Sequence, residues 1–416
     1  MALSDIYQKA SLVQIPSGYK SGTLYSVVPN IADGDFTVTG DPEGEATRVN
    51  KDGIIETVAA DVPRLNYDPT NPQDPHLLLE PTSTNSLPES ENFGTNWFII
   101  GLSVSSGISS PDGGTNAYSL IEGTGTGGKI IYDTISVSAG SVTYSLFMKK
   151  GDKKYTALLL SGAVSTSMFN VDLENGTGTT VTGSFDSTNI EEYPNGWYRV
   201  SVTATATAGN LNCNVYLMNG STYNDRNYTG NGTDKTYIFG AQLETGYLTS
   251  YIPTSGSAVT RTQDRCFNGG DANLFNDSEG VLFADLEALG EGTTTRKISL
   301  SNGNTSFVNF NFNATSGRVD FEFGSTLNSF YIVNSTGHTL TNRNKIAIKY
   351  KSGDTDCFIN GTRVTGNNGT FSLSGLDRVN FENRGTSGSQ NMFAKIHQLM
   401  VFNEALTDSE LQALTS

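Results

Sequence analysis

The chain has 416 residues, 45 of them glycine and 16% of them charged, and its formal net charge is −16. A field of that sign repels phosphate backbones, and no run of Lys and Arg forms a local exception, so the composition argues against nucleic-acid binding. The length exceeds one ordinary hydrophobic core, and we therefore expect two or three domains. Abundant Gly, Ser, Thr and Asn favour short strands joined by turns, which predicts an all-β fold.

The cysteines and the apolar runs indicate the compartment in which the chain folds. The chain has three widely spaced cysteines, Cys213, Cys266 and Cys357. An odd number of cysteines makes no disulfide framework and favours a reducing compartment. Asp5 and Gln8 lie where a signal peptide needs an unbroken apolar stretch. The longest apolar run, Trp97–Leu102, is too short to cross a bilayer. We expect a soluble chain made in the cytoplasm, without membrane insertion.

Residues 1–86 differ in composition from the rest of the chain. Three dipeptides favour extended chain and turns: Asp68-Pro69, Asn71-Pro72 and Asp74-Pro75. The apolar pieces between the turns are short and cannot easily bury a core of their own. We interpret this segment as an N-terminal anchoring region of short strands and extended chain, which packs on a partner or on the next domain.

Residues 87–264 alternate between apolar and polar side chains in repeated short runs, the pattern of half-buried strands. The clearest runs are Lys129–Ile135, Val142–Met148, Tyr155–Leu160, Trp197–Thr205, Cys213–Met218 and Thr236–Phe239. Roughly eight strands are expected here, the size of a jelly-roll sandwich. The polar stretch Ser255–Asp264 is the clearest domain boundary in the chain.

Residues 265–416 predict a second jelly-roll sandwich. Its candidate strands are Val281–Leu286, Arg296–Ser301, Phe307–Phe312, Arg318–Phe323, Phe330–Val333, Lys345–Tyr350, Asp356–Ile359, Arg378–Phe381 and Phe393–Phe402. Asn360-Gly361 is typical of a type I′ hairpin turn. Thr407 and Glu410 form the capping-box pattern of a short C-terminal helix.

Catalytic residues are not evident, and we predict that the chain is not an enzyme and uses no cofactor. A glycan-cleaving jelly roll needs two carboxylates that face each other across a cleft. The nearest approaches are Asp285 with Glu287 and Asp320 with Glu322, which we interpret as solvated strand faces. The three histidines have no Cys or His at metal-ligand spacing.

A structural calcium ion is left open, because the oxygens of Asp and Asn suit calcium and these residues are abundant. Two groups of aspartates could contribute ligands: Asp33, Asp35 and Asp41, or Asp271 and Asp277. The spacing of an EF-hand is missing, so the sequence assigns no metal ligand.

Sugar binding uses exposed aromatic rings, which stack on pyranose faces, beside amides and carboxylates that bond the hydroxyls. Tyr216, Tyr223 and Tyr228 lie in or beside a loop rich in Asn and Asp, and they are the candidate glycan-binding residues. The alternative for each tyrosine is a half-buried packing role in a strand or loop. Trp97 and Trp197 are expected in the core.

Several stretches of residues 10–265, in preserved order, resemble tailed-bacteriophage structural proteins of the minor-structural, tail-fibre and head-fibre kind. The earlier stretches are Ile15–Lys20, Leu24–Ser26, Gly34–Phe36, Ala46–Asn50, Gly53–Glu56, Val62–Tyr67, Leu77–Pro81, Thr84-Asn85 and Ser90–Phe93. The later ones are Gly196–Arg199, Gly240–Glu244 and Ser250–Thr254, closing on Arg261 and Asp264. The resemblance implies an N-terminal region (1–86) and a carbohydrate-binding-module-like jelly roll (87–264). Residues 265–416 resemble a laminin-G or concanavalin A-like sandwich, through Ile396–Asn403 and Ala405–Asp408.

For function, this resemblance implies a non-enzymatic component of the virion, a tail or head fibre or appendage, assembled in the host cytoplasm. The N-terminal region is expected to contact other virion proteins, and the chain to form a homo-oligomer, for which trimers are the habit of fibres. The jelly rolls are expected to contact host-surface polysaccharide, where weak contacts repeated over several copies add up. Two alternatives stay open: a capsid or tail decoration protein with a purely stabilising role, and a glycan-degrading enzyme or its accessory module.

Overall fold

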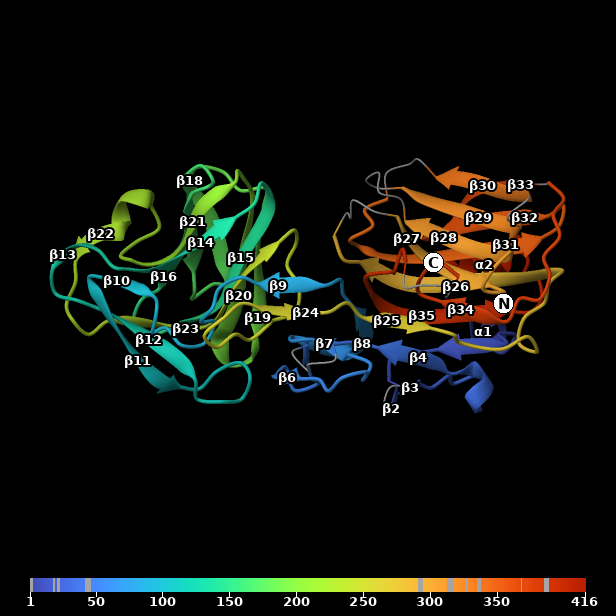
Figure 1. The fold of residues 1–416 in the computed structure, drawn as a ribbon, viewed down its shortest axis with the longest axis horizontal. Helices are drawn as coiled ribbons and strands as arrows, with labels where there is room; N and C mark the ends of the chain where they lie inside the picture. The colour runs from blue at the N-terminus through green and yellow to red at the C-terminus, as the bar shows by residue number, and fades with distance from the viewer. Residues whose placement is uncertain are drawn as a thin grey trace.

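The computed structural model describes residues 3–17, 19–20, 23–41, 46–290, 295–312, 318–325, 328–334, 338–367, 369–384 and 389–416. It confirms an all-β fold of antiparallel sheets with a short C-terminal helix, α2 (Asp408–Thr415); a further short helix, α1 (Leu3–Tyr7), begins the described chain. Figure 1 shows two lobes side by side along the long axis, joined by β9 (Ser83–Asn85) and β24 (Val259–Arg261), which pair with each other.

The first lobe, here the jelly-roll lobe (residues 87–258), holds two six-stranded sheets. The β14 sheet has the order β10 (Phe98–Ile100), β14 (Ile130–Val137), β21 (Gly209–Met218), β16 (Tyr155–Gly162), β17 (Ser167–Asp172) and β18 (Thr177–Thr182). The β15 sheet has the order β11 (Leu102–Ile108), β12 (Ala117–Glu122), β23 (Lys235–Thr245), β15 (Gly140–Lys150), β20 (Trp197–Ala206) and β19 (Ser187–Tyr193). Side chains such as Leu158 and Val200 alternate inward from both sheets into one buried core.

The second lobe, here the C-terminal lobe, also pairs two sheets. The β28 sheet has the order β30 (Asn328–Asn334), β29 (Val319–Ser325), β28 (Ser306–Phe312), β27 (Arg296–Ser301) and β34 (Arg378–Asn380). The β26 sheet has the order β33 (Thr362–Asn367), β32 (Thr355–Ile359), β31 (Arg343–Lys351), β26 (Glu279–Ala288), β35 (Ala394–Phe402), β8 (Asn71–Leu79) and β7 (Leu65–Asp68), and β1 (Leu12–Gln14) also pairs with β35.

The N-terminal region is built into the C-terminal lobe. β8 pairs with β35 through Leu77 and Ile396, and β4 (Phe36–Thr39) pairs with β25 (Arg265–Phe267) in a small sheet with β3 (Thr23–Leu24) and β2 (Tyr19–Lys20). Leu12, Phe36 and Leu77 are buried in the same core as the strands from the end of the chain. The jelly-roll lobe is therefore inserted between two parts of the C-terminal lobe, and both described ends of the chain lie in the latter (Figure 1). The division into 1–86, 87–264 and 265–416 stays a prediction.

Two local predictions that rest on short sequence motifs, a hairpin turn and a helix cap, are confirmed. Asn360 and Gly361 have φ angles of 49° and 74° and connect β32 to β33, as a type I′ turn requires. Thr407 caps α2, and the side chain of Glu410 accepts the backbone N–H of Thr407, which completes the capping box.

A buried histidine on β8 makes stability depend on pH. His76 packs 5.6 Å from His397 of β35 between ring centroids, and burial, helped by the charge of Lys395, lowers the pKa of His76 to about 3. In the unfolded chain this pKa is near 6.5, so the unfolded state binds the extra proton below pH 6.5 and stability falls as the pH drops toward 3.

We expect His76→Gln to flatten this pH dependence. The wild-type chain should lose about 2 kcal/mol more than the variant between pH 7.5 and pH 5, because one pKa unit corresponds to about 1.4 kcal/mol. Urea unfolding of both chains at the two pH values measures the difference. Parallel losses in the two chains would show that His76 is protonated alike in the folded and unfolded states.

Candidate functional site

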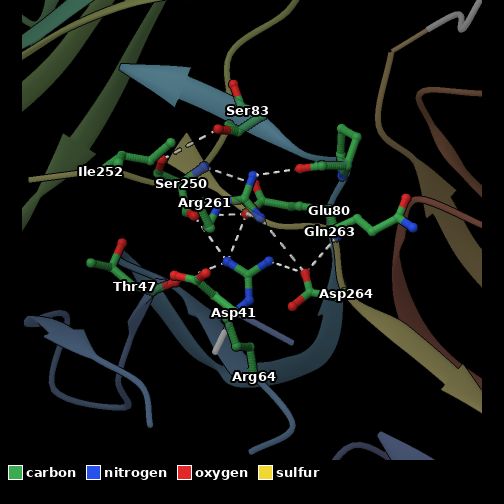
Figure 2. Close-up of polar contacts among 12 residues, drawn as sticks. Asp41, Thr47, Arg64, Glu80, Ser83, Ser250, Ile252, Arg261, Gln263 and Asp264 are labelled. Carbon is green, nitrogen blue, oxygen red and sulfur yellow. Dashed lines mark hydrogen bonds and ion pairs between the residues drawn. The ribbon is translucent and has the colours of Figure 1, made fainter. Parts of the chain in front are cut away.

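Four charged side chains meet where the chain passes between the lobes, and we call them the junction network: Arg64, Glu80, Arg261 and Asp264 (Figure 2). Arg64 immediately precedes β7 and Glu80 follows β8, on the way out to the jelly-roll lobe. Arg261 ends β24 and Asp264 precedes β25, on the way back. All four are at most 5% exposed.

The geometry of the junction network neutralises each charge. Arg64 Nη1 donates to Glu80 Oε2 at 2.6 Å, its Nη2 donates to Asp264, and Arg261 Nη1 lies 3.3 Å from Glu80 Oε2. The backbone N–H and the hydroxyl of Ser250 also donate to Glu80, each at 2.7 Å. Burial alone would raise the pKa of Glu80, but Arg261 and Arg64 lower it to about 2. Glu80 therefore stays ionised, and the network ties both chain passes together.

Several of the sequence stretches quoted for the expected resemblance converge on this junction. Besides the four charged residues, they contribute Asn85, whose side-chain amide donates to the carbonyls of Ala241 and Ile252. Gln242 accepts the backbone N–H of Ile252 through its Oε1 atom. Sequence reasoning named these residues only as parts of a resemblance, and missed that they form one cluster.

Tyr216 lies on the outer face of the β14 sheet, directed away from the core between the sheets. It is opposite Ile130 of β14 and Ala157 of β16, and it is half-buried. On the same face, Phe98 of β10 stacks on Tyr132 of β14 with ring centroids 5.1 Å apart, and Phe98 is 57% exposed. An exposed aromatic surface therefore crosses the β10 edge of this sheet.

Polar side chains continue the same face two residues further along the strands. Thr134 Oγ1 donates to Asn212 Oδ1 at 2.7 Å, and Asn212 Nδ2 lies 3.3 Å from Ser161 Oγ. Aromatic rings and amides thus lie next to each other, the combination that saccharides require. We call Phe98, Tyr132, Tyr216, Thr134 and Asn212 the aromatic face.

The other two predicted tyrosines differ from each other. Tyr223, in the 3-10 turn Tyr223–Arg226, packs against the same apolar cluster as Tyr216, and the Arg226 guanidinium lies 3.5 Å from its ring centroid. Tyr228, on β22 (Asn227–Thr229), is set apart and buried. Its hydroxyl donates to Glu122 at 2.7 Å and Lys153 Nζ lies 4.4 Å from its ring centroid. Its ring is therefore not available for a sugar, whereas glycan binding by Tyr216 and Tyr223 stays a prediction.

The acidic pairs on the C-terminal strands are structural ion pairs. Asp285 accepts two hydrogen bonds from Arg343, at 2.8 and 2.9 Å, and Glu287 pairs with Lys395 at 2.9 Å. Asp320 pairs with Arg318 at 2.7 Å, whereas Glu322 pairs with Lys297 at 3.3 Å. The prediction that these carboxylates lie on solvated strand faces was wrong for Asp285, Asp320 and Glu322, which are at most 4% exposed. A buried carboxylate needs such partners to remain ionised.

Three of the aspartates considered for calcium accept hydrogen bonds from the protein itself. Asp35 accepts the backbone N–H of Ser26, Asp41 accepts a hydrogen bond from Thr262, and Asp277 accepts the backbone N–H groups of residues 375 and 376. Within the described ranges, no three or more His, Cys, Asp or Glu side chains gather to hold a metal ion. The same part of the chain contains no helix long and apolar enough to span a bilayer.

Comparison with known proteins yields partial likenesses of fold. No family model matches the chain, and neither does any curated protein. The Ruminococcus gnavus IT-sialidase CBM40 bound to α2,3 sialyllactose is similar with a TM-score of 0.31 and 17% identity, over 36% of this chain and 94% of that one. A SAP-like pentraxin from Limulus polyphemus is similar with a TM-score of 0.27 and 13% identity, over 34% and 70% of the two chains. Domain 4 of the Geobacillus stearothermophilus arabinanase AbnA, in complex with arabinotriose, is similar with a TM-score of 0.31 and 13% identity, over 37% and 73%.

Proposed function

We propose that this chain is a non-enzymatic structural protein of a tailed-phage virion that contacts host-surface glycans through the aromatic face. One observation carries the glycan contact: Phe98 is 57% exposed on a sheet edge and stacks on Tyr132, two residues from Thr134 on the same strand. An exposed ring of this size leaves apolar surface in water, which a pyranose face would cover. The neighbouring amide and hydroxyl would then bond the sugar hydroxyls.

We expect Phe98→Ala to weaken binding of host-surface polysaccharide roughly tenfold, because losing one stacked ring costs about 1–1.5 kcal/mol. Affinity electrophoresis of the full chain in gels that contain the polysaccharide measures the change. Tyr7→Ala is the matched control, since Tyr7 on α1 is another exposed aromatic residue, 39% exposed. If both variants lose affinity equally, or neither does, the aromatic face is not the binding surface.

The N-terminal region is proposed to contact other virion proteins. Four apolar side chains between residues 25 and 31 are exposed there: Tyr25, Val27, Val28 and Ile31. Exposed apolar groups gathered in one segment are typical of a protein–protein contact. Assembly into a homo-oligomer, with a trimer as the first expectation, belongs to the same proposal.

Immunogold labelling of intact particles tests the location on the virion. Labelling at the tail or head appendages supports the proposal, and unlabelled particles contradict it. Labelled particles whose protein binds no glycan would favour the alternative of a purely stabilising decoration protein. Glycan hydrolysis that is lost in Asp285→Asn or Glu322→Gln would instead support the enzyme alternative.

A further inference from the structure

A cavity of about 370 Å³ lies where three parts of the chain meet, and we call it the junction cavity. The jelly-roll lobe lines it with β19 and β20, and the N-terminal region lines it with β5 (Thr47–Val49), Ile55 and β7. The C-terminal lobe contributes Lys395 and the end of β26. The volume lies within the range of small-ligand pockets. The cavity is separate from the aromatic face, because β19 and β20 belong to the β15 sheet.

Arg199 is a buried cation on the jelly-roll wall of this cavity. Its side chain follows Trp197 on the outer face of β20; it is 5% exposed, and its guanidinium lies 5.4 Å from the ring centroid of Phe147. Its Nε and Nη2 atoms have no hydrogen-bond partner within the described structure. Glu191 is its cross-strand neighbour on β19, but the hydrogen bond of that carboxyl group is with Tyr193. A buried guanidinium with unpaired donors is costly.

The other charged residues that line the cavity have partners. Arg48 lies 2.7 Å from Glu56, Lys395 lies 2.9 Å from Glu287, and Glu80 belongs to the junction network. Uncharged hydrogen-bonding groups line the jelly-roll wall of the cavity, on the same two strands β19 and β20: Ser187, Asn189, Ser201 and Thr203. Among the described lining residues, Arg199 is thus the cation that forms no salt bridge, although the charge of its cross-strand neighbour Glu191 acts on it.

We propose that the junction cavity binds a small ligand that carries a carboxylate on a polyhydroxylated body, such as an acidic monosaccharide, with the carboxylate paired to Arg199. The planar guanidinium matches a carboxylate through two parallel hydrogen bonds. Ser201 and Asn189 are placed to bond hydroxyls of the same ligand. A phosphate dianion fits less well, because the carboxylates of Glu191, Glu287 and Glu80 line the same space and repel its second charge.

The test is calorimetric titration of the full chain with three probes: sodium D-glucuronate, D-glucose and inorganic phosphate. We expect glucuronate to bind at least about tenfold more tightly than the other two, since only glucuronate offers both the carboxylate and the hydroxyls. Arg199→Met should weaken glucuronate binding by roughly tenfold or more. Lys351→Met, which removes a cation paired with Glu279 outside the cavity, should leave it unchanged.

A second variant keeps the test decisive if Arg199→Met fails to fold. Asn189 is exposed at the cavity wall, so Asn189→Trp fills the cavity without altering the core, and it should also abolish glucuronate binding. Equal affinities for glucuronate and glucose, tighter binding of phosphate, or glucuronate affinity unchanged in Asn189→Trp would overturn the proposal. So would an equal loss in Lys351→Met, because binding would then follow net charge. None of these results bears on the aromatic face, whose probe is the host polysaccharide.

Discussion

Replacing Glu80 by glutamine is expected to lower the free energy of unfolding by about 3–5 kcal/mol, the usual cost of breaking a buried ion pair from one side. The side chain of Glu80 is 3% exposed and faces both Arg64 and Arg261. Without its charge, two buried guanidinium groups share the single carboxylate of Asp264. Guanidinium chloride unfolding of the full chain, followed by circular dichroism and tyrosine fluorescence, measures the loss.

Glu56→Gln is the control for this prediction. Glu56 also pairs with an arginine of the N-terminal region, Arg48, but its side chain is 36% exposed, so about 1 kcal/mol or less should be lost. The pH dependence gives an independent check. Glu80 has a pKa of about 2 in the folded chain and an ordinary value of 4.5. Its contribution to the free energy of unfolding is therefore present above pH 4.5 and is lost as the pH falls toward 2. Similar losses in both variants would mean that the junction network adds no more than a surface pair.

Residues 265–416 alone are expected not to fold. Their sandwich takes Leu12, Phe36, Leu77 and Leu79 from the N-terminal region into its core, and β8 covers an edge of β35. Burying each of these side chains contributes about 1.5–3 kcal/mol. The burial of all four side chains therefore contributes about as much free energy as the net stability of a typical domain. Without them, the fragment also exposes an apolar strand edge, which promotes aggregation.

The matched fragment, residues 87–258, should fold alone, since the described members of its core between the two sheets all lie between Leu87 and Leu243. Solubility, two-dimensional NMR dispersion and cooperative thermal unfolding distinguish the two fragments. Co-expression of residues 1–86 should rescue residues 265–416. A soluble, cooperatively unfolding fragment 265–416 would contradict the insertion of the jelly-roll lobe into one continuous C-terminal lobe.

Strands with strong apolar alternation were predictable from the sequence, and those made of Ser and Thr were not. Arg296–Ser301 was predicted with its observed bounds, because its apolar residues alternate regularly. In contrast, β18 and β19 lie at sheet edges, where most of their side chains are exposed. Because these strands contain few apolar residues in alternation, the sequence did not predict them. About eight strands were expected, and the lobe has two six-stranded sheets.

The pairing of the N-terminal region with the end of the chain could not be predicted. β8 contains Pro72 and Pro75, which favour extended chain but argue against a strand inside a sheet. Both prolines lie before Leu77, and only Leu77–Leu79 pair with β35. The prolines therefore lie outside the part of β8 that pairs with strands on both sides. No local sequence pattern shows where that part begins.

The candidate sites were predictable only in part. Tyr216 was singled out because of its polar neighbourhood, yet the exposed ring beside it, Phe98, belongs to the apolar run Trp97–Leu102 that was considered only as a membrane span. Trp97 is buried whereas Phe98 is exposed, and the run itself does not show which side faces water. Arg199 and the junction network depend on contacts between residues far apart in the sequence. Such contacts become visible only in the fold.

Binding of the full chain to a glycan array and to host cells tests the proposed function most directly. We predict that the chain binds a host-surface polysaccharide in both assays, and that Phe98→Ala lowers the signal in both while Tyr7→Ala does not. The absence of binding to the array and to the cells would contradict the recognition role.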